Sequence, residues 1–323
     1  MKAIRVHQHG GPDVLAYENV ELGNPGPGEV RVRNRAIGVN FVDIYLRRGS
    51  YPPPQLPFIP GKEGAGEVIA VGSGVEGFKP GDRVAYAEAL GAYADEHNVP
   101  AHFLVHLPDG IDFETGAAMM LKGLTAQYLL RRTFRVKAGH TILVHAAAGG
   151  VGLILTQWAK HLGATVIGTV GSPEKAELAR AHGADHVIDY SAEDFAARVR
   201  EITKGEGADV VYDGIGKATF EGSLDSLRPF GHFVSFGAAS GPIPPFDITT
   251  LARKGSLYAT WPLLPAHLSR REDVTAMSKD LLDVVGSGVV TIPVHARLPL
   301  AEAAEAHRRL EDRQTTGAMV LLP

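Results

Sequence analysis

The sequence contains no cysteine among its 323 residues. This absence excludes disulfide bonds, catalysis by a thiolate, and every zinc or iron–sulfur site that depends on Cys ligands.

Long apolar runs and an excess of one charge are also missing. No run approaches the roughly 18 apolar residues that a membrane-spanning helix needs, and Met1–Gly10 lacks the apolar core of a secretory signal. The formal net charge is −4 and both signs are interspersed, so no basic stripe favours nucleic acid and no polybasic segment favours a membrane. We expect a globular, cytoplasmic protein with the length of about two domains.

Residue patterns divide the chain into two kinds of structure. Residues 2–6 and 29–35 alternate between apolar and polar, and residues 64–71 form a run of small and β-branched residues, which predicts strands in a β-rich domain. From about Thr125, short apolar runs alternate with helix-length segments, which is typical of a parallel sheet covered on both faces. These runs cover residues 141–145, 165–169, 186–188, 209–212 and 232–236.

The C-terminal segment resembles the first third in its strands and Pro turns. A helix is predicted over about residues 271–287, a strand in VVTIPVHARLP, a helix over 300–311 and a final strand over 318–322. We therefore predict an α/β protein in which residues 1–124, with 267–323 returning to them, form one domain. Residues 125–266 form the second, doubly wound domain.

The sharpest motif runs from Thr141 to Gly152 as TILVHAAAGGVG, a buried strand followed by a glycine-rich turn and a helix. Ala147, Gly149 and Gly152 stand where the dinucleotide fingerprint needs small residues, although its first Gly is Ala here. The helix that begins near Gly150 and Val151 offers free N–H groups and a positive dipole end to a pyrophosphate. A turn with a packing role alone is the alternative.

The end of the next strand favours NADP over NAD. Residues 164–170 are followed by Gly171-Ser172-Pro173, without the Asp or Glu that usually holds a ribose 2′-hydroxyl. Lys175 and the Ser172 hydroxyl are predicted to bind a 2′-phosphate, with Glu174 facing solvent. Tyr190 is predicted to add a hydroxyl donor near the adenosine. An ordinary solvated lysine and a half-buried loop tyrosine are the alternatives.

Gly139–Lys160, GHTILVHAAAGGVGLILTQWAK, resembles the quinone oxidoreductase and ζ-crystallin branch of the medium-chain dehydrogenase/reductase family. The resemblance continues over nearly the whole chain in GVNFVDIYLRRGSYP, GKEGAGEV, GDRVAY, LKGLTAQYLL, VVYDGIG, SFGAASG, KGSLYATWP and TTGAMVLLP. It implies a GroES-like domain made from both chain ends, a Rossmann domain between them, NADPH as the cofactor and a homodimer that pairs through residues 255–259.

Relatives that bind zinc carry a metal-ligating Cys and a His where this sequence reads Gly38-Val39-Asn40 and Gly61-Lys62-Glu63. Asn is a poor zinc ligand and Lys62 is a cation, so the residues predict an enzyme without catalytic zinc. We expect Lys62 to pair with Glu63 or Asp43, or to enter the mouth of the pocket.

The resemblance also implies the remaining site residues. Asn40 and Tyr45 are the catalytic candidates, because an amide and a phenol can donate to a developing oxyanion. A turn asparagine and a core tyrosine are the alternatives. Asp213 is expected to be structural. The other expected cofactor contacts are Thr125 at the start of the Rossmann helix, the strand end at Phe236, Gly237 and Ala238, and Arg313. A plain glycine turn after the strand and a surface arginine are the alternatives.

Three functions remain open from the sequence. The first is hydride transfer from NADPH to a quinone, and the second is reduction of an alkenal, enone or enoyl thioester, for which Tyr45 can supply the proton. The third is a binding role, as an NADPH-binding crystallin-like or RNA-binding protein, against which the acidic net charge counts. Loops at Tyr51–Pro57 and Trp261–His267 are expected to shape the acceptor pocket.

Overall fold

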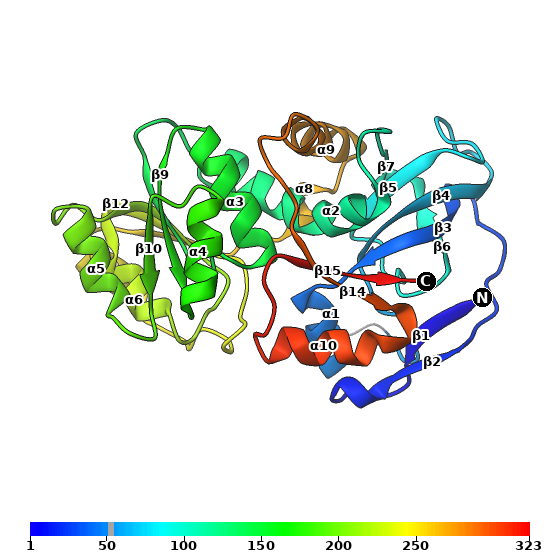
Figure 1. Cartoon of the computed structure of the whole chain (residues 1–323), viewed down its shortest axis with the longest axis horizontal. Helices are drawn as coiled ribbons and strands as arrows, with labels where there is room; N and C mark the ends of the chain where they lie inside the picture. Colours follow the sequence, from blue (N-terminus) through cyan, green and yellow to red (C-terminus); the bar gives the residue numbers. More distant parts are fainter. Residues whose placement is uncertain (51–54) are drawn as a thin grey trace. The chain divides into compact units, whose positions relative to one another are not determined.

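The computed structural model describes residues 1–50 and 55–323, drawn in Figure 1. Tyr51–Pro54, from one of the loops expected to shape the acceptor pocket, lie outside the described residues. The chain divides into two compact units. Unit 1 comprises Met1–Leu124, His267–Gly286 and Ile292–Pro323, and unit 2 comprises Thr125–Ala266 and Ser287–Thr291.

Unit 1 is built on a seven-stranded sheet to which both ends of the chain contribute. The strand order is β14-β15-β3-β4-β5-β7, and β6 also pairs with β3. All pairs are antiparallel except β14 with β15. The C-terminal strand beside β3 confirms a GroES-like domain formed by both ends of the chain. The strands are β3 (Glu29–Gly38), β4 (Glu63–Val71), β5 (Arg83–Ala87), β6 (Glu96–Pro100), β7 (Leu104–His106), β14 (Val294–Pro299) and β15 (Ala318–Leu322), with β1 (Lys2–Val6) and β2 (Leu15–Asn19) as a separate pair.

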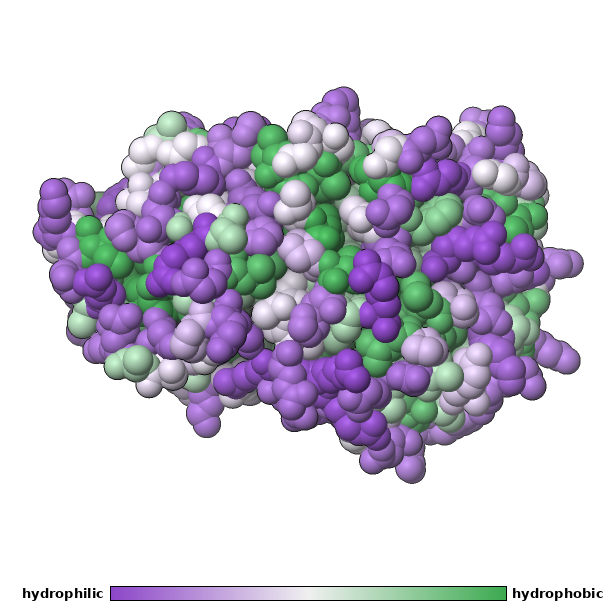
Figure 2. All heavy atoms as spheres, in the orientation of Figure 1, coloured by the Kyte–Doolittle hydropathy of each residue, from purple (hydrophilic) through white to green (hydrophobic). Residues whose placement is uncertain are grey.

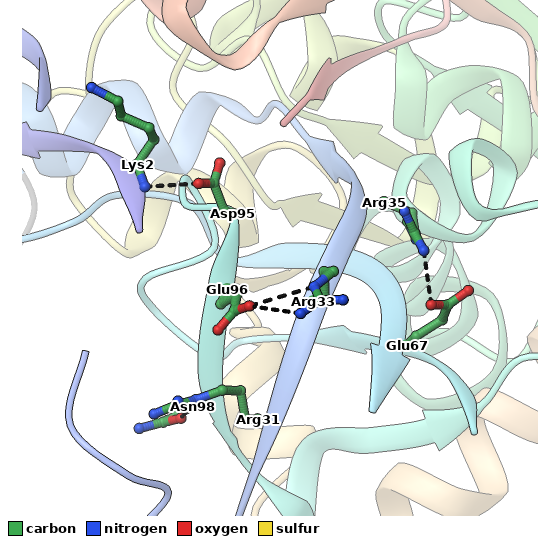
Figure 3. A network of polar contacts seen from close by, with 8 residues as sticks. All are labelled: Lys2, Arg31, Arg33, Arg35, Glu67, Asp95, Glu96 and Asn98. Atoms are coloured by element: carbon green, nitrogen blue, oxygen red, sulfur yellow. Dashed lines mark hydrogen bonds and ion pairs between the residues drawn. The ribbon is translucent and has the colours of Figure 1, made fainter. Parts of the chain in front are cut away.

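The alternation in β3 separates a core face from a solvent face. Val30 and Val32 are fully buried. Arg33 and Arg35, on the exposed face, reach neighbouring strands: Arg33 pairs with Glu96 of β6 at 3.2 Å and Arg35 pairs with Glu67 of β4 at 2.9 Å (Figure 3). Exposed pairs of this kind contribute about 0–1 kcal/mol each, so the buried face supplies most of the stability of this sheet.

A buried arginine of helix α1 (Phe41–Arg48) forms hydrogen bonds with helix α10 (Ala303–Glu311). Arg47 is fully buried and donates to the Gly10 carbonyl at 3.1 Å, to His307 Nδ1 at 3.0 Å and to Glu311 at 2.5 Å. These bonds join segments from opposite ends of the sequence. Also in unit 1 are α9 (Arg271–Gly286), most of α2 (Phe113–Tyr128), and the 3₁₀ turns η1 (Pro12–Val14), η2 (Ala101–Phe103) and η4 (Leu300–Glu302).

Unit 2 is a doubly wound domain around a parallel sheet. The strand order β10-β9-β8-β11-β12-β13 corresponds to 3-2-1-4-5-6 in chain order, which confirms the Rossmann topology and places its switch point between β8 and β11. The strands are β8 (Thr141–Val144), β9 (Thr165–Val170), β10 (His186–Asp189), β11 (Ala208–Asp213), β12 (Leu227–Ser235) and β13 (Tyr258–Thr260). The helices are α3 (Gly150–His161), α4 (Pro173–Ala181), α5 (Phe195–Ile202), α6 (Phe220–Asp225), α7 (Thr249–Arg253) and α8 (Leu264–His267), with a π-helical turn, η3 (Leu129–Thr133).

Two local expectations were wrong. Thr125 does not start a helix but lies near the end of α2, which begins at Phe113 after Asp112 accepts a hydrogen bond from Thr115 N at 2.7 Å. This Asp is an N-terminal capping signal. The expected loop Trp261–His267 includes the short helix α8.

The surface in Figure 2 is largely hydrophilic, with separate hydrophobic patches between the polar side chains. Among the helices that the structure describes, none combines the length and the apolar character needed to cross a membrane.

Candidate functional site

The glycine-rich turn of unit 2 leaves no room for side chains where the fingerprint predicts small residues. A Cβ added to Gly152 would overlap the Ala146 carbonyl oxygen and lie 2.9 Å from Ala147 Cα. Gly149 is the N-cap of α3, and Ala147 N donates to Thr169 O at 3.0 Å. The turn therefore lies against the end of β9 and presents the N-terminus of α3, an arrangement that fits a dinucleotide pyrophosphate.

The end of β9 gathers the residues predicted for the adenosine end. Ser172 is the N-cap of α4, and its oxygen accepts from Lys175 N at 3.3 Å. A Cβ on Gly171 would lie 2.6 Å from the Tyr190 hydroxyl oxygen, so the ring of Tyr190 covers this glycine. Ser172, Lys175 and Tyr190 thus lie around one strand end, as a 2′-phosphate site requires.

Glu174 is exposed, yet it interacts with this same helix end. Hydrogen bonds from its own backbone N–H and from the Ser172 hydroxyl hold the pKa of the Glu174 carboxyl below its usual range. One anion, a carboxylate, therefore already occupies the N-terminus of α4. A phosphate bound here would have to displace it.

The loops after β11 and β12 are joined to each other. Phe236 N donates to Asp213 O at 2.9 Å, and Ser240 N donates to Ile215 O at 2.8 Å. A Cβ on Gly237 would lie 2.7 Å from the Gly214 carbonyl oxygen, so the close approach of the two loops needs glycine. The predicted cofactor residues Phe236, Gly237 and Ala238 follow directly after β12, at the carboxyl edge of the sheet.

In unit 1, Asn40 is the N-cap of α1 and is held by acidic side chains. Asp43 accepts from Asn40 N at 2.9 Å and completes a capping box. The Asn40 side-chain nitrogen donates to Glu63 Oε1 at 2.8 Å. This bond fixes the orientation of the amide and uses one of its two N–H groups.

Glu63 is the centre of a buried polar cluster that was not predicted from the sequence. Its Oε1 accepts from Lys122 Nζ at 2.5 Å as well as from Asn40, and its Oε2 accepts from Leu121 N at 2.7 Å. Glu63 is fully buried, and a Cβ on Gly38 would overlap its carboxylate. One signal was present: Lys122 is a single charge within the otherwise apolar helical run AAMMLKGLTA.

From the sequence we expected Lys62 to pair with Glu63 or Asp43 or to enter the mouth of the pocket. In the structure it pairs with Glu88 instead. Its Nζ lies 2.5 Å from Glu88 Oε2, and both side chains are largely buried. Glu88 has a φ of 67° and so lies in the left-handed region, which few non-glycine residues adopt. Glu88 could not be predicted as the partner of Lys62 from the sequence pattern. It lies 26 residues away along the chain, and its position depends on an unusual backbone conformation.

The remaining predicted residues fall in both units. Tyr45 is half-buried on α1, with its ring 6.2 Å from that of Phe41. Arg313, with a φ of 58°, follows α10 in unit 1, whereas Thr125 is buried in unit 2. Unit 1 therefore holds Asn40, Tyr45 and Arg313, and unit 2 holds the other predicted cofactor residues.

Asp43 lies in a fully buried polar chain behind Asn40. Its Oδ2 accepts from the Tyr93 hydroxyl at 3.2 Å, and that hydroxyl lies 3.0 Å from His307 Nε2. Burial raises the pKa of the Asp43 carboxyl to about 7, although the hydrogen bond from Asn40 N opposes this shift. Burial, together with the charge of Arg47, lowers the pKa of His307 to about 3.

The donors around Asn40 do not fit a catalytic zinc ion. The Asn40 nitrogen and both Glu63 oxygens are used within the cluster, and Lys62 and Lys122 are cations. Amide and ammonium groups are poor zinc ligands. Among residues 1–50 and 55–323, no group of three or more His, Asp or Glu side chains is arranged to hold a metal ion.

We predict that Asp43→Asn changes how stability depends on pH. Between about pH 4, where an unfolded aspartate titrates, and about pH 7, the folded chain binds a proton that the unfolded chain does not. The contribution of Asp43 to the free energy of unfolding should therefore fall over this range. The free energy of unfolding of D43N minus that of the unsubstituted protein should therefore rise by on the order of 4 kcal/mol between pH 4 and pH 8. Urea unfolding at a series of pH values measures this difference.

Asp109→Asn is the control for this prediction, because the Asp109 side chain is fully exposed. It should leave the pH dependence unchanged. A difference between D43N and the unsubstituted protein that is the same at every pH would contradict the prediction.

Comparisons with known proteins agree over both units. Residues 26–109 match the alcohol dehydrogenase GroES-like domain, and residues 150–263 match the family described as zinc-binding dehydrogenase. A quinone oxidoreductase of Pseudomonas aeruginosa is 56% identical over 100% of this chain and 99% of its own. A 2-haloacrylate reductase of Burkholderia sp. is 49% identical over 98% of each chain.

Solved structures give the same result. The crystal structure of Escherichia coli quinone oxidoreductase complexed with NADPH has a TM-score of 0.98 and 48% identity, with 100% of both chains covered. The sequence and the fold therefore agree over the full length. The chain belongs to the quinone oxidoreductase branch of the medium-chain dehydrogenase/reductase family.

Proposed function

We propose that this protein is an NADPH-dependent reductase that transfers a hydride to a quinone without a metal. The observation that carries the proposal is the full-length agreement with an NADPH-bound quinone oxidoreductase, combined with a tight glycine turn that leads from β8 into the N-terminus of α3. In this proposal residues 125–266 bind the nucleotide, and residues 1–124 with 267–323 form the catalytic domain. We propose the cytoplasm as its location, because NADPH is a metabolite of the cell interior.

The nucleotide-binding role is assigned to residues along one edge of the Rossmann sheet. The pyrophosphate is held by the N-terminus of α3 and its glycine turn, and the 2′-phosphate by charge and hydroxyl groups at α4. Thr125 and Arg313 complete the proposed cofactor contacts. The full set on the sheet is Ala147, Gly149, Gly150, Val151, Gly152, Ser172, Lys175, Tyr190, Phe236, Gly237 and Ala238.

The catalytic role is assigned to Asn40 and Tyr45. When bound, NADPH supplies a hydride from its nicotinamide ring, and the protein must stabilise the oxyanion that develops on the acceptor. Asn40 is suited to this because Glu63 fixes its amide and leaves one N–H available. The oxyanion of a reduced quinone is delocalised over its ring, so hydrogen-bond donors suffice without a Lewis acid.

A second function is favoured by one relative. The 49% identity to a 2-haloacrylate reductase supports reduction of a conjugated carbon–carbon double bond. That reaction needs a proton donor to the α-carbon, and Tyr45 is our candidate. NADPH storage and RNA binding are the remaining alternatives, and neither is favoured by a feature of the structure.

The proposal predicts which acceptor is reduced fastest. Initial rates of NADPH oxidation should be higher with an ortho- or para-quinone than with an alkenal, a 2-haloacrylate or an enoyl thioester. Tyr45→Phe separates the two functions, because loss of its hydroxyl should slow alkene reduction more than quinone reduction. Faster turnover of an alkene acceptor would replace the first function by the second, and tight NADPH binding without any turnover would reject both.

The 2′-phosphate site predicts the cofactor preference. Lys175→Ala should weaken NADPH binding by roughly tenfold or more and leave NADH binding nearly unchanged, since only NADPH carries the phosphate. Fluorescence titration with both nucleotides measures the ratio. Lys204→Ala, remote from this strand end in sequence, is the charge-matched control. An unchanged ratio of the two affinities would show that Lys175 does not bind the phosphate.

We further propose a homodimer formed through the free edge of the Rossmann sheet. β13 is the edge strand, and all its residues are exposed. β13 has three residues, and an exposed sheet edge that carries apolar side chains favours pairing with another strand. Exposed apolar residues of unit 2 on or near this strand in sequence are Phe246 (41%), Ile248 (71%), Tyr258 (57%), Trp261 (43%) and Leu263 (44%).

The dimer proposal predicts that Tyr258→Asp shifts the protein from dimer to monomer in sedimentation velocity, because a charge on the edge strand opposes pairing. Tyr17→Asp is the matched control: Tyr17 is also exposed, at 43%, and lies on β2 of unit 1. A dimer that persists in Y258D, or a monomeric unsubstituted protein, would exclude this interface.

A further inference from the structure

A fully buried histidine lies beneath the glycine turn of unit 2. His145 directly follows β8, and both of its ring nitrogens make hydrogen bonds: Nδ1 lies 2.8 Å from Thr169 Oγ1 and Nε2 lies 2.9 Å from Ser223 Oγ. Ser223 Oγ in turn lies 2.8 Å from Asp213 Oδ2. His145, Thr169, Ser223 and Asp213 are each no more than 1% exposed. The four residues form one continuous chain of hydrogen bonds.

The direction of every bond in this chain follows from Asp213. Its Oδ1 accepts from the backbone N–H groups of Ile215 and Gly216, at 2.8 and 2.9 Å. Its Oδ2 accepts from Thr219 Oγ1 at 2.7 Å as well as from Ser223. A carboxylate cannot donate, so Ser223 must donate to Asp213 and its oxygen is then an acceptor for His145.

The tautomer of His145 is thereby fixed. Nε2 carries the proton and donates to Ser223, and Nδ1 accepts from the Thr169 hydroxyl. Burial lowers the pKa of His145, and the negative charge of Asp213 opposes this shift. The neutral ring that the hydrogen bonds require is therefore also the form that burial favours.

The chain connects the segments that surround the phosphate-binding turn. Thr169 lies in β9, Asp213 ends β11, Ser223 lies in α6, and His145 joins β8 to the turn. The His145 ring also packs edge-on against Phe195 of α5, with centroids 4.9 Å apart and an interplanar angle of 85°. Hydrogen bonds at both ring nitrogens and the contact with Phe195 therefore together restrict the orientation of the His145 ring.

The residue after His145 shows what this restraint achieves. Ala146 has a φ of 52°, a left-handed conformation that is unfavourable for a residue with a Cβ. Such strain persists where the surroundings over-determine the backbone, and it clusters at ligand-binding sites. His145 N also donates to Tyr212 O at 3.1 Å, so backbone and ring together hold the entry to the turn.

We propose that the chain Thr169–His145–Ser223–Asp213 positions the glycine turn and the loop after β11 for the nucleotide. These are positioning residues, since none is proposed to touch the cofactor. The inference rests on the proposed binding of NADPH to unit 2. It assigns to His145 a role beyond filling the core: a preorganised turn does not have to be ordered when the pyrophosphate binds, so affinity is higher.

The test compares two serines of similar environment. Ser223 and Ser226 are both fully buried, in α6 and at its C-cap, but the Ser226 hydroxyl donates to Gly222 O at 2.7 Å, outside the chain. Ser223→Ala should weaken NADPH binding roughly tenfold in fluorescence titration, whereas Ser226→Ala should stay within about twofold. Both should lower the melting temperature of the protein without NADPH.

The outcomes separate this inference from the proposed function. Equal changes in NADPH affinity for S223A and S226A, or no change in either, would overturn the inference while the proposed function stands. An unsubstituted protein that does not bind NADPH would reject the proposed function and the inference with it. A weaker affinity in S223A alone supports both.

A second pair of variants tests the same hydrogen-bond chain if S223A does not fold. Thr169→Val removes the hydroxyl at constant shape, and Thr169→Ser restores it. T169V should weaken NADPH binding and T169S should recover most of it. Nitrogen-15 NMR of the unsubstituted protein should show His145 protonated at Nε2 and unprotonated at Nδ1 across neutral pH. The opposite tautomer, or equal affinities in T169V and T169S, would overturn the inference.

Discussion

A carboxylate that is removed from water must find donors for its oxygens within the protein, and each unit is organised around one such group. In unit 1, Glu63 draws the side chains of Asn40 and Lys122 and the N–H of Leu121 to a single point. In unit 2, the carboxylate of Asp213 receives two backbone and two hydroxyl donors. The cost of leaving either carboxylate unsatisfied, several kcal/mol, fixes the surrounding loops. Among the candidate functional residues, Asn40 belongs to the first cluster, and Phe236 is joined to the second through the hydrogen bond that its N–H donates to Asp213 O.

The two clusters suit different tasks. The cluster of Glu63 includes a cation, so its charge is balanced, and it leaves the Asn40 amide rigid but still able to donate. The cluster of Asp213 is built from neutral donors and extends through Ser223 to a histidine under the glycine turn. The first favours stabilisation of charge on an acceptor, and the second favours a preorganised surface for a bound nucleotide.

The fold could be predicted from the sequence because its signals are local. Buried strands and the glycine turn have periodicities and spacings that can be recognised within about ten residues, and β1 and β15 have the predicted bounds. The polar clusters could not be predicted in this way. Lys122 lies 59 residues from Glu63, Glu88 lies 26 residues from Lys62, and Ser223 lies 78 residues from His145. Such pairs depend on how the loops meet, which no periodicity encodes.

The position of the adenosine-end residues has a consequence for how this protein can evolve. Ser172, Lys175 and Tyr190 lie at the accessible end of β9, and Tyr190 is 41% exposed, whereas the chain beneath the turn is buried. Substitutions at this rim disturb neither of the two carboxylate clusters. With the 2′-phosphate bound as proposed, a lineage carrying this fold can exchange one nicotinamide nucleotide for the other through a few substitutions at the protein surface, while the buried residues beneath the glycine turn stay unchanged.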